Sequence, residues 1–268
     1  MGESRRCVTL TTDFGTSGPY AGSMRGAVLR ANPEVVVVDN THEIGRGNIR
    51  EGALVIGCSF ASFPDGTIHI VVVDPTVGSD RLPILVSTEN HYFLAPDNGV
   101  LSYIFQHEEI YNVVEITEDH FFNKPTSRTF HGRDIFAPVA GWLAKVQDVG
   151  RFGEPISEYV IERFAEPVQV KEKAWKGEIL FIDPFGNAIT NLTTDHIPGD
   201  ENGYPAVNRI LTLRGEIRQV RTFYCERTED EPFLILGSLG YYEIAVNGAS
   251  AAERLQLAPG NEVGVILR

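Results

Sequence analysis

The chain has 268 residues, of which 43% are hydrophobic and 22% charged, and a formal net charge of −13. This composition predicts a globular protein of one or two domains with enough apolar side chain for a sizeable core. The acidic balance argues against an extended nucleic-acid surface, because a phosphate backbone requires clustered lysine and arginine.

The cysteines and the apolar runs bear on the cellular location of the protein. Cys7, Cys58 and Cys225 follow no zinc-ligand spacing and are expected to stay reduced, so we predict no metal site. We recognise no signal peptide, and no apolar stretch approaches the length of a membrane span. These observations predict a cytoplasmic protein without membrane or nucleic-acid partners.

The first 150 residues alternate between apolar runs and segments with helical spacing. Strands are predicted at 7–12, 35–39, 67–73, 84–87 and 91–95. Helices are predicted at 23–31, 49–60, 100–106 and 134–143. The alternation predicts an α/β domain over 1–160, with a mostly parallel sheet covered on both faces.

The pattern changes after Gly150. Val160 to Glu172 contains prolines and strand-like alternation, and short strands are predicted at 177–182, 209–213, 216–222, 232–236, 241–246 and 263–267. Few helix signals separate these runs. They predict a smaller all-β barrel or sandwich domain over 170–268, with the boundary between 158 and 170.

Two polar segments of the first domain are candidates for a site. The run VVVDPTVGSDR at 71–81 predicts a buried strand that ends at Asp74, followed by a turn that returns Arg81. Such strand ends form the ligand crevices of α/β sheets, although for this segment alone a capping acid is the favoured interpretation. In FHGRD at 130–134, Asp134 is expected to cap a helix, and His131 is expected to be structural unless it meets Asp74 and Arg81.

Asp13 follows the first strand and precedes a glycine-rich turn. Its carboxylate suits two vicinal ribose hydroxyls, and a simple helix-entry acid is an equal alternative. The pattern is not GxGxxG, so a dinucleotide fingerprint is absent.

Candidate binding residues of the second domain lie in turn-like segments. Asp183, Phe185 and Asn187 would form a compact polar pocket with an aromatic wall, or an ordinary β-turn. Ser238 and Ala249 lie in two further segments, for which an ordinary turn is the favoured interpretation and a ligand-binding loop is the alternative. Of the aromatic pair 223–224, either ring could stack on a base, and core packing is the favoured interpretation for Phe223.

Several of these segments occur together, and in one order, in a known family. They are TDFG at 12–15, THEI at 41–44, VVDP–VGS–R at 72–81, APDNG at 95–99, TFHGRDIFAPVA at 129–140, IDPFGNAITN at 182–191 and GYYEIAVN at 240–247. Together they resemble the S-adenosyl-L-methionine hydroxide adenosyltransferase family, which is related to the bacterial fluorinase and chlorinase. The resemblance spans nearly the whole chain, and TFHGRDIFAP is its most specific motif.

The resemblance implies an α/β domain, a β domain and a homotrimer whose sites lie between neighbouring subunits. It implies that water-derived hydroxide attacks the ribose 5′-carbon of S-adenosyl-L-methionine and releases adenosine and L-methionine, with no cofactor. Asp74, Arg81 and His131 would activate the water. The substrate-binding residues would be Asp13 at the ribose, Asp183, Asn187 and Ser238 at the methionine, and Phe223 or Tyr224 at the adenine.

Two alternatives stay open beside hydrolysis: a non-catalytic protein that binds S-adenosylmethionine or adenosine, and halide-dependent adenosyl transfer. Asp74 disfavours the second, because a carboxylate beside the attack position repels a halide and accepts a proton from water. The chain also departs from relatives at four positions. Three of these positions differ from fluorinase: Gly132 replaces the serine that donates to fluoride, Leu239 replaces the arginine that binds the methionine carboxylate, and Gly47 lies near the place of the tryptophan that packs on the ribose. The fourth, Thr76, replaces a glycine that is usual in the hydroxide family.

Overall fold

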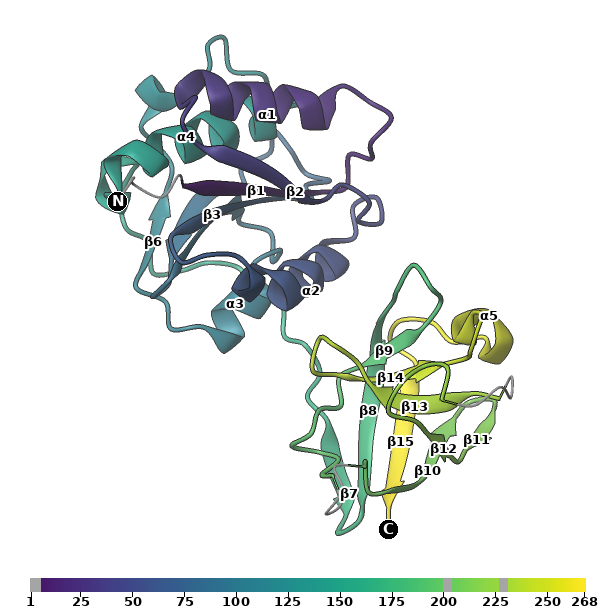
Figure 1. Ribbon diagram of the computed structural model, residues 1–268. Coiled ribbons are helices and arrows are strands. Elements are labelled where there is room, and N and C mark those ends of the chain that lie inside the picture. The colour runs from purple at the N-terminus through teal and green to yellow at the C-terminus, as the bar shows by residue number, and fades with distance from the viewer. Residues whose placement is uncertain (1–5, 200–203, 227–230) are drawn as a thin grey trace, which may run out of the picture. The chain divides into compact units, whose positions relative to one another are not determined.

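The chain folds into two compact units, Met1–Arg163 and Phe164–Arg268. The computed structural model describes residues 6–199, 204–226 and 231–268, and its elements are labelled in Figure 1. The division falls inside the stretch at 158–170 where the sequence pattern changes. No helix in the described part of the chain is long and apolar enough to span a bilayer.

A six-stranded mixed sheet forms the centre of the first unit, in the order β2-β1-β3-β5-β4-β6. Strands β2, β1, β3 and β5 run parallel, whereas β4 is antiparallel to both β5 and β6. Only residues 88–90 separate β4 from β5, and a parallel crossover needs a much longer connection. The expectation of a mostly parallel sheet is therefore met in part: three of the five strand pairings are parallel, and the sheet as a whole is mixed. The strands are β1 (Cys7–Thr12), β2 (Val36–Thr41), β3 (Thr67–Val72), β4 (Pro83–Ser87), β5 (His91–Pro96) and β6 (Asn112–Glu115).

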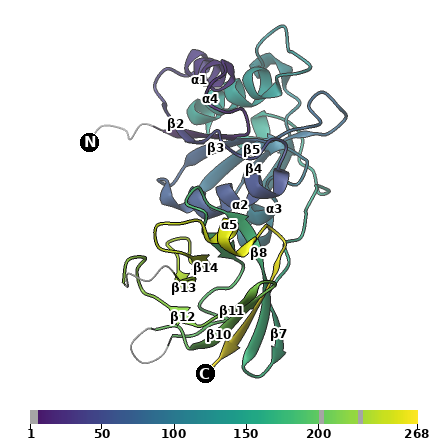
Figure 2. The same ribbon diagram turned by 90° about the vertical axis from the view of Figure 1, so that its right-hand side faces the viewer.

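Helices cover both faces of this sheet, as Figures 1 and 2 show. One apolar cluster joins α1 and α4 to β1 and β3, and a second joins α2 and α3 to the opposite face. The helices are α1 (Tyr20–Ala31), α2 (Ile49–Ser59), α3 (Ser102–His107) and α4 (Ala137–Val146), with 3₁₀ turns η1 (Phe60–Ser62), η2 (Asp119–Phe121) and η4 (Val149–Arg151).

The helix predicted over 134–143 begins differently from the expectation. A π-helical turn, η3 (Gly132–Phe136), precedes α4, and Pro138 occupies the first turn of α4. Asp134 lies inside the π turn, where its carboxylate accepts from Ser127 N at 2.9 Å and binds the Arg133 guanidinium. The prediction that Asp134 is an N-cap is wrong, because its side chain closes the preceding loop.

The second unit is a nearly closed, barrel-like sheet in the order β11-β10-β15-β8-β9-β14-β13-β12, with β7 paired to β8. The two ends of this order are β11 and β12, and only Arg218 separates them in the chain. One short helix, α5, belongs to the unit, so the all-β expectation is corrected. The elements are β7 (Val168–Lys171), β8 (Ala174–Ile182), β9 (Ala188–Thr190), β10 (Val207–Thr212), β11 (Gly215–Ile217), β12 (Gln219–Val220), β13 (Phe233–Leu236), β14 (Tyr242–Ala245), α5 (Ala251–Leu255) and β15 (Glu262–Leu267).

A β-bulge interrupts the pairing of β1 with β2 close to the strand ends. Leu10 pairs with Asp39, but Thr11 pairs with Thr41, so Asn40 is the extra residue. A bulge changes which side chains share a face of the sheet.

Candidate active site

Three side chains of the first unit form one chain of contacts. The Arg81 guanidinium donates from Nε to Asp74 Oδ2 at 2.8 Å, and its Nη2 also binds this oxygen. The same Nη2 donates to His131 Nδ1 at 2.8 Å. The Asp74 and Arg81 side chains are only 3% and 7% exposed. The structure thus brings together the three predicted residues: Asp74 after β3, Arg81 after the following turn, and His131 just before the π turn that leads into α4.

The turn between Asp74 and Arg81 has two notable positions. Thr76 donates its hydroxyl to Asp74 Oδ1 in a long contact of 3.3 Å, and Ser79 N donates to Thr76 O at 3.0 Å. Gly78 has a φ of +83°, and an added Cβ there would lie 2.3 Å from Arg128 O. The glycine is therefore required, whereas threonine at 76 is compatible with the turn and adds a contact to the acid.

The contact with Arg81 determines the protonation of His131. A guanidinium only donates hydrogen bonds, so His131 Nδ1 is an acceptor and the neutral ring carries its proton on Nε2. Burial, and then the charge of Arg81, lower the pKa of His131 from its ordinary 6.5. His131 is therefore a neutral hydrogen-bond donor at physiological pH.

Asp74 and His131 border a cavity of about 450 Å³ in the first unit. The rings of Phe14, Tyr20 and Phe130 pack together at one wall, with centroid separations of 5.4 to 6.0 Å. The lining residues are Asp13, Phe14, Tyr20, Arg46, Val72, Asp74, Val77, Thr129, Phe130, His131 and Gly132. The cavity therefore holds carboxylates, an imidazole and an aromatic wall.

Asp13 is held at this cavity by the backbone of a neighbouring loop. Gly47 N donates to Asp13 Oδ2 at 2.8 Å, and the positive φ of 67° at Gly47 turns this amide into the site. One oxygen of Asp13 is used in this way. Two vicinal hydroxyls of a ligand would find the remaining acceptor positions of the carboxylate.

The second unit has a pocket of its own, of about 740 Å³. It contains all but one of the binding residues predicted in this half of the chain, together with Glu243. The lining residues are Asp183, Phe185, Asn187, Ile189, Tyr224, Ser238, Leu239, Glu243, Val246, Asn247, Gly248, Ala249 and Ser250. Two carboxylates make this pocket suitable for a cationic group.

Asp183 organises one wall of this pocket. Its Oδ1 accepts from the backbone amides of Phe185 at 2.9 Å and Asn187 at 2.8 Å, and its Oδ2 accepts from Asn187 Nδ2 at 2.9 Å. The segment is thus a turn, as one interpretation expected, and the residues of this turn also line the pocket. Phe185, at the tip of the turn, is 80% exposed and presents a free aromatic face.

Glu243 is a buried carboxylate that the sequence analysis missed, and it is bound by the partly exposed Tyr224. Tyr224 OH donates to Glu243 Oε2 at 2.8 Å, and Glu243 is 5% exposed. Burial, with the neighbouring Glu243, raises the pKa of Tyr224 to about 12. Burial also raises the pKa of Glu243, and Asp183 adds to this effect. Glu243 lies within the GYYEIAVN motif. A charged residue between apolar residues of a predicted strand was the sequence signal that could have identified it as a site residue.

The core-packing expectation for Phe223 is wrong, because its side chain is 54% exposed. Phe223 is also outside the lining of the pocket, where Tyr224 supplies the aromatic ring. No three histidine, cysteine, aspartate or glutamate side chains converge as metal ligands within residues 6–199, 204–226 and 231–268.

Both halves of the chain match family models. Residues 8–153 match the SAM hydroxide adenosyltransferase N-terminal domain, and residues 177–264 match the C-terminal domain. A crystal structure of an uncharacterised conserved protein from Thermotoga maritima superposes with a TM-score of 0.89 at 32% identity, covering 97% of this chain and 99% of that one.

Curated relatives match along nearly the whole length. An (R)-S-adenosyl-L-methionine hydrolase of Methanocaldococcus jannaschii is 31% identical, over 97% of this chain and 95% of the relative. A fluorinase of Actinopolyspora mzabensis is 24% identical, over 98% of this chain and 97% of the relative. The two family models together cover most of the sequence, and the chain therefore belongs to the SAM hydroxide adenosyltransferase family.

Proposed function

We propose that this protein is an enzyme that hydrolyses S-adenosyl-L-methionine to adenosine and L-methionine. The observation that carries the proposal is the contact chain Asp74–Arg81–His131 at a cavity that also holds Asp13. Relatives named as hydrolases at about 30% identity support the same reaction. The sulfonium is already a good leaving group, so the reaction needs an aligned nucleophile rather than an acid or a cofactor.

Asp74 is the proton acceptor in this proposal. Its Oδ2 is bound by Arg81, while Oδ1 meets, among the residues the structure describes, only the long Thr76 contact and keeps lone pairs for a water molecule. His131 holds its proton on Nε2, so it orients the water oxygen as a donor and does not take the proton. Water then forms a bond to the 5′-carbon, the carbon–sulfur bond breaks toward sulfur, and the water proton passes to Asp74.

The remaining predicted residues bind the substrate. Asp13 would hold the ribose hydroxyls, and Asp183, Asn187 and Ser238 the methionine end. Tyr224 would lie beside the adenine, with Phe185 and Ala249 at the pocket walls. Phe223 is not retained in this assignment, because it lies outside the pocket lining.

We also propose that the chain works as a homotrimer in which neighbouring copies complete the sites. Support comes from the division of the ligand-binding groups, since the groups proposed for one substrate occur in two separate pockets of two compact units. A cytoplasmic location, and the lack of nucleic-acid and membrane partners, stay predictions from the composition.

The reaction is tested by incubating the pure protein with S-adenosylmethionine in ¹⁸O-labelled water, with and without chloride. Mass spectrometry should show adenosine with ¹⁸O at its 5′ position and unlabelled methionine. A 5′-halo product would identify halide transfer instead. Recovered substrate, with binding measured by calorimetry, would identify a non-catalytic binding protein. Replacing Asp74 by alanine should abolish adenosine formation while sparing substrate binding.

A further inference from the structure

The β-bulge at Asn40 places a buried histidine beside the strand that leads to Asp13. Without the extra residue, the register Leu10–Asp39 would continue to Thr12 opposite Thr41. With it, Thr11 pairs with Thr41, and His42 lies next to Thr12. Asp39, Thr12 and His42 thereby share the sheet face that carries α1.

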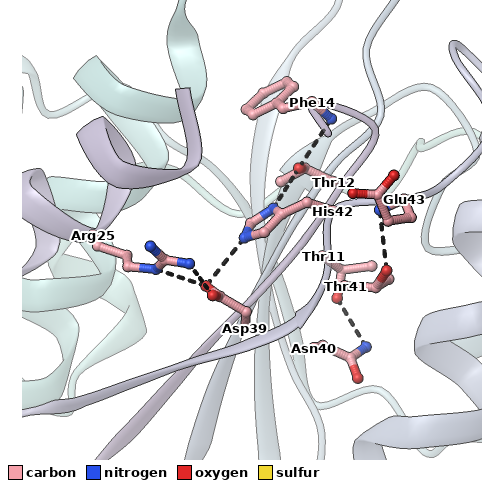
Figure 3. A network of polar contacts seen from close by, with 9 residues as sticks. All are labelled: Thr11, Thr12, Phe14, Arg25, Asp39, Asn40, Thr41, His42 and Glu43. Carbon is pink, nitrogen blue, oxygen red and sulfur yellow. Dashed lines mark hydrogen bonds and ion pairs between the residues drawn. The ribbon is translucent and has the colours of Figure 1, made fainter. Parts of the chain in front are cut away.

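A continuous chain of polar contacts runs along this face, as Figure 3 shows. His42 Nδ1 lies 2.8 Å from Thr12 Oγ1, and Phe14 N donates to the same oxygen at 3.2 Å. A carboxylate only accepts hydrogen bonds, so the ring nitrogen that faces Asp39, Nε2, carries a proton, and Nδ1 then accepts from the Thr12 hydroxyl. Nε2 lies 3.1 Å from Asp39 Oδ1, outside ideal hydrogen-bond geometry, so this contact is chiefly electrostatic.

The far end of the chain is anchored on α1. Arg25 donates from Nε to Asp39 Oδ1 at 2.8 Å and also binds Oδ2. The Arg25 guanidinium lowers the pKa of Asp39, so this carboxylate stays ionised at neutral pH. His42 is 3% exposed and Thr12 is fully buried. The orientation of His42 is therefore set at both ring nitrogens.

His42 in turn joins the two loops that hold Asp13. Gly15 N donates to His42 O at 2.7 Å, and Ile44 N donates to Thr12 O at 3.4 Å. Gly47, in the loop that follows His42, supplies the amide that binds Asp13 Oδ2. The Asp13 carboxylate is thus fixed between two loops that are bound to each other through His42 and Thr12.

We infer that Thr12, His42 and Asp39 are positioning residues that hold Asp13 for recognition of a ribose diol. The inference rests on the proposed function, since it requires that adenosine binds at Asp13. It predicts that these residues control selectivity for the diol rather than overall affinity alone.

Thr11 provides a matched control on the same strand. Its hydroxyl is equally buried but points to the other face, where it accepts from Asn40 Nδ2 at 3.1 Å. Asn40 also binds Ser59 of α2, and Figure 3 shows the two threonines with their separate contacts. Thr11→Val and Thr12→Val therefore remove equivalent groups from one strand, and only the second group leads to His42.

The test measures inhibition constants for adenosine and 2′,3′-dideoxyadenosine in the full-length protein. Wild type should prefer adenosine, and Asp13→Ala should lose this preference. Thr12→Val should reduce the preference by roughly 5- to 10-fold, the size of one hydrogen bond, whereas Thr11→Val should keep it. His42→Asn retains an acceptor near the position of Nδ1 and should keep the preference, whereas His42→Leu should reduce it.

Equal preferences in Thr12→Val and Thr11→Val would overturn the inference. If Thr12→Val does not fold, the comparison of His42→Asn with His42→Leu tests the inference in its place. Equal preferences for adenosine in these two variants would also overturn it. A wild type that neither binds adenosine nor consumes S-adenosylmethionine would instead overturn the proposed function.

Discussion

At the residue scale, the two oxygens of Asp74 have different surroundings. Oδ2 is held by two donors of Arg81, whereas Oδ1 accepts a long contact from the Thr76 hydroxyl at 3.3 Å. Hydrogen bonds from a guanidinium hold a carboxylate in one orientation, and the second oxygen then faces the reacting water. The expected consequences concern the charge of Asp74 and the tautomer of His131.

Replacing Asp74 by asparagine keeps the shape of the side chain and removes the base. We expect kcat to fall by about 10²- to 10⁴-fold, the usual contribution of a positioned base, with KM little changed. Steady-state kinetics of adenosine release measure both constants. As a control, Ser79→Ala alters the same turn without touching the acid, and it should keep kcat. A wild-type kcat in the asparagine variant would remove Asp74 from the mechanism.

The protonation state of His131 can be followed by titration. Burial and the Arg81 charge lower its pKa, so its midpoint in an NMR titration should fall below the ordinary 6.5. Protonation at Nδ1 would replace an acceptor facing Arg81 by a donor, so kcat/KM should decrease only at pH values below that midpoint. The His131→Asn variant assigns the resonance. A midpoint above 6.5 would contradict the neutral donor role.

In the second unit, Tyr224 is the donor that satisfies buried Glu243. Tyr224→Phe leaves the Glu243 carboxylate without this bond, and we expect a loss of about 1–3 kcal/mol in the free energy of unfolding. Urea denaturation measures it. In the double variant with Glu243→Gln, the buried charge is absent and part of the loss should be recovered. Equal stabilities of wild type and Tyr224→Phe would show that Glu243 has another donor.

At the element scale, a polar ladder crosses the first sheet on its α2 side. Thr9 on β1 binds His69 Nδ1 at 2.7 Å, and His69 Nε2 lies 3.2 Å from His91 Nδ1 on β5. The ring of His69 stacks on Phe93 with centroids 5.1 Å apart. Burial, and then His91, lower the pKa of His69 to about 3.

This ladder predicts acid sensitivity of the first unit. The folded pKa of His69 is below its unfolded value, so the unfolded state takes up a proton first as the pH falls. Stability is full above the ordinary value of 6.5 and decreases toward 3, by about 1.4 kcal/mol per pH unit for one proton. Denaturation at several pH values measures the slope. His69→Gln should flatten it, and an unchanged slope would contradict the assignment.

Much of the arrangement of elements was predictable, because long apolar runs such as 67–72 and the helical spacing at 49–59 are strong local signals. The direction of each strand was not predictable, because a buried strand has the same apolar sequence whether its neighbour runs parallel or antiparallel to it. β9 and α5 have only 3 and 5 residues, too few for a period to emerge.

The candidate site was predictable only in part. The motifs identified Asp74, Arg81 and His131, and the contacts among them required the folded chain. The bulge at Asn40 leaves no sequence signature, because its cause is the register of a neighbouring strand. His42 stood in the quoted motif THEI, but its link to Thr12 depends on that bulge. Phe223 and Tyr224 were equivalent by type, and only the folded chain shows that Tyr224 lines the pocket and binds Glu243, whereas Phe223 does not line it.

At the scale of the whole molecule, each apolar cluster found among the described residues draws its members from one unit. Two clusters belong to the first unit, and two to the second. The groups proposed for one substrate are likewise divided, with Asp74 in the first unit and Asp183 in the second. This division makes the proposed assembly testable by complementation.

Asp74→Ala and Asp183→Ala should each be inactive alone. If neighbouring copies complete each site, co-refolded mixtures at equal amounts should regain roughly a quarter of the wild-type activity, because random association gives an intact pair of units at that frequency. Light scattering on wild type should give the mass of a trimer. Activity that stays absent in the trimeric mixture would show that each chain completes its own site.

The single residue between β11 and β12, Arg218, is a site at which the second unit can be circularly permuted. Those strands end the sheet order, whereas β7 and β15, the first and last strands of the unit, both pair with β8. A circular permutant that joins β15 to β7 through a flexible linker and opens the chain at Arg218 would keep every strand pair. Its folding rate would then report how much the covalent connection at Arg218 contributes to closing the barrel.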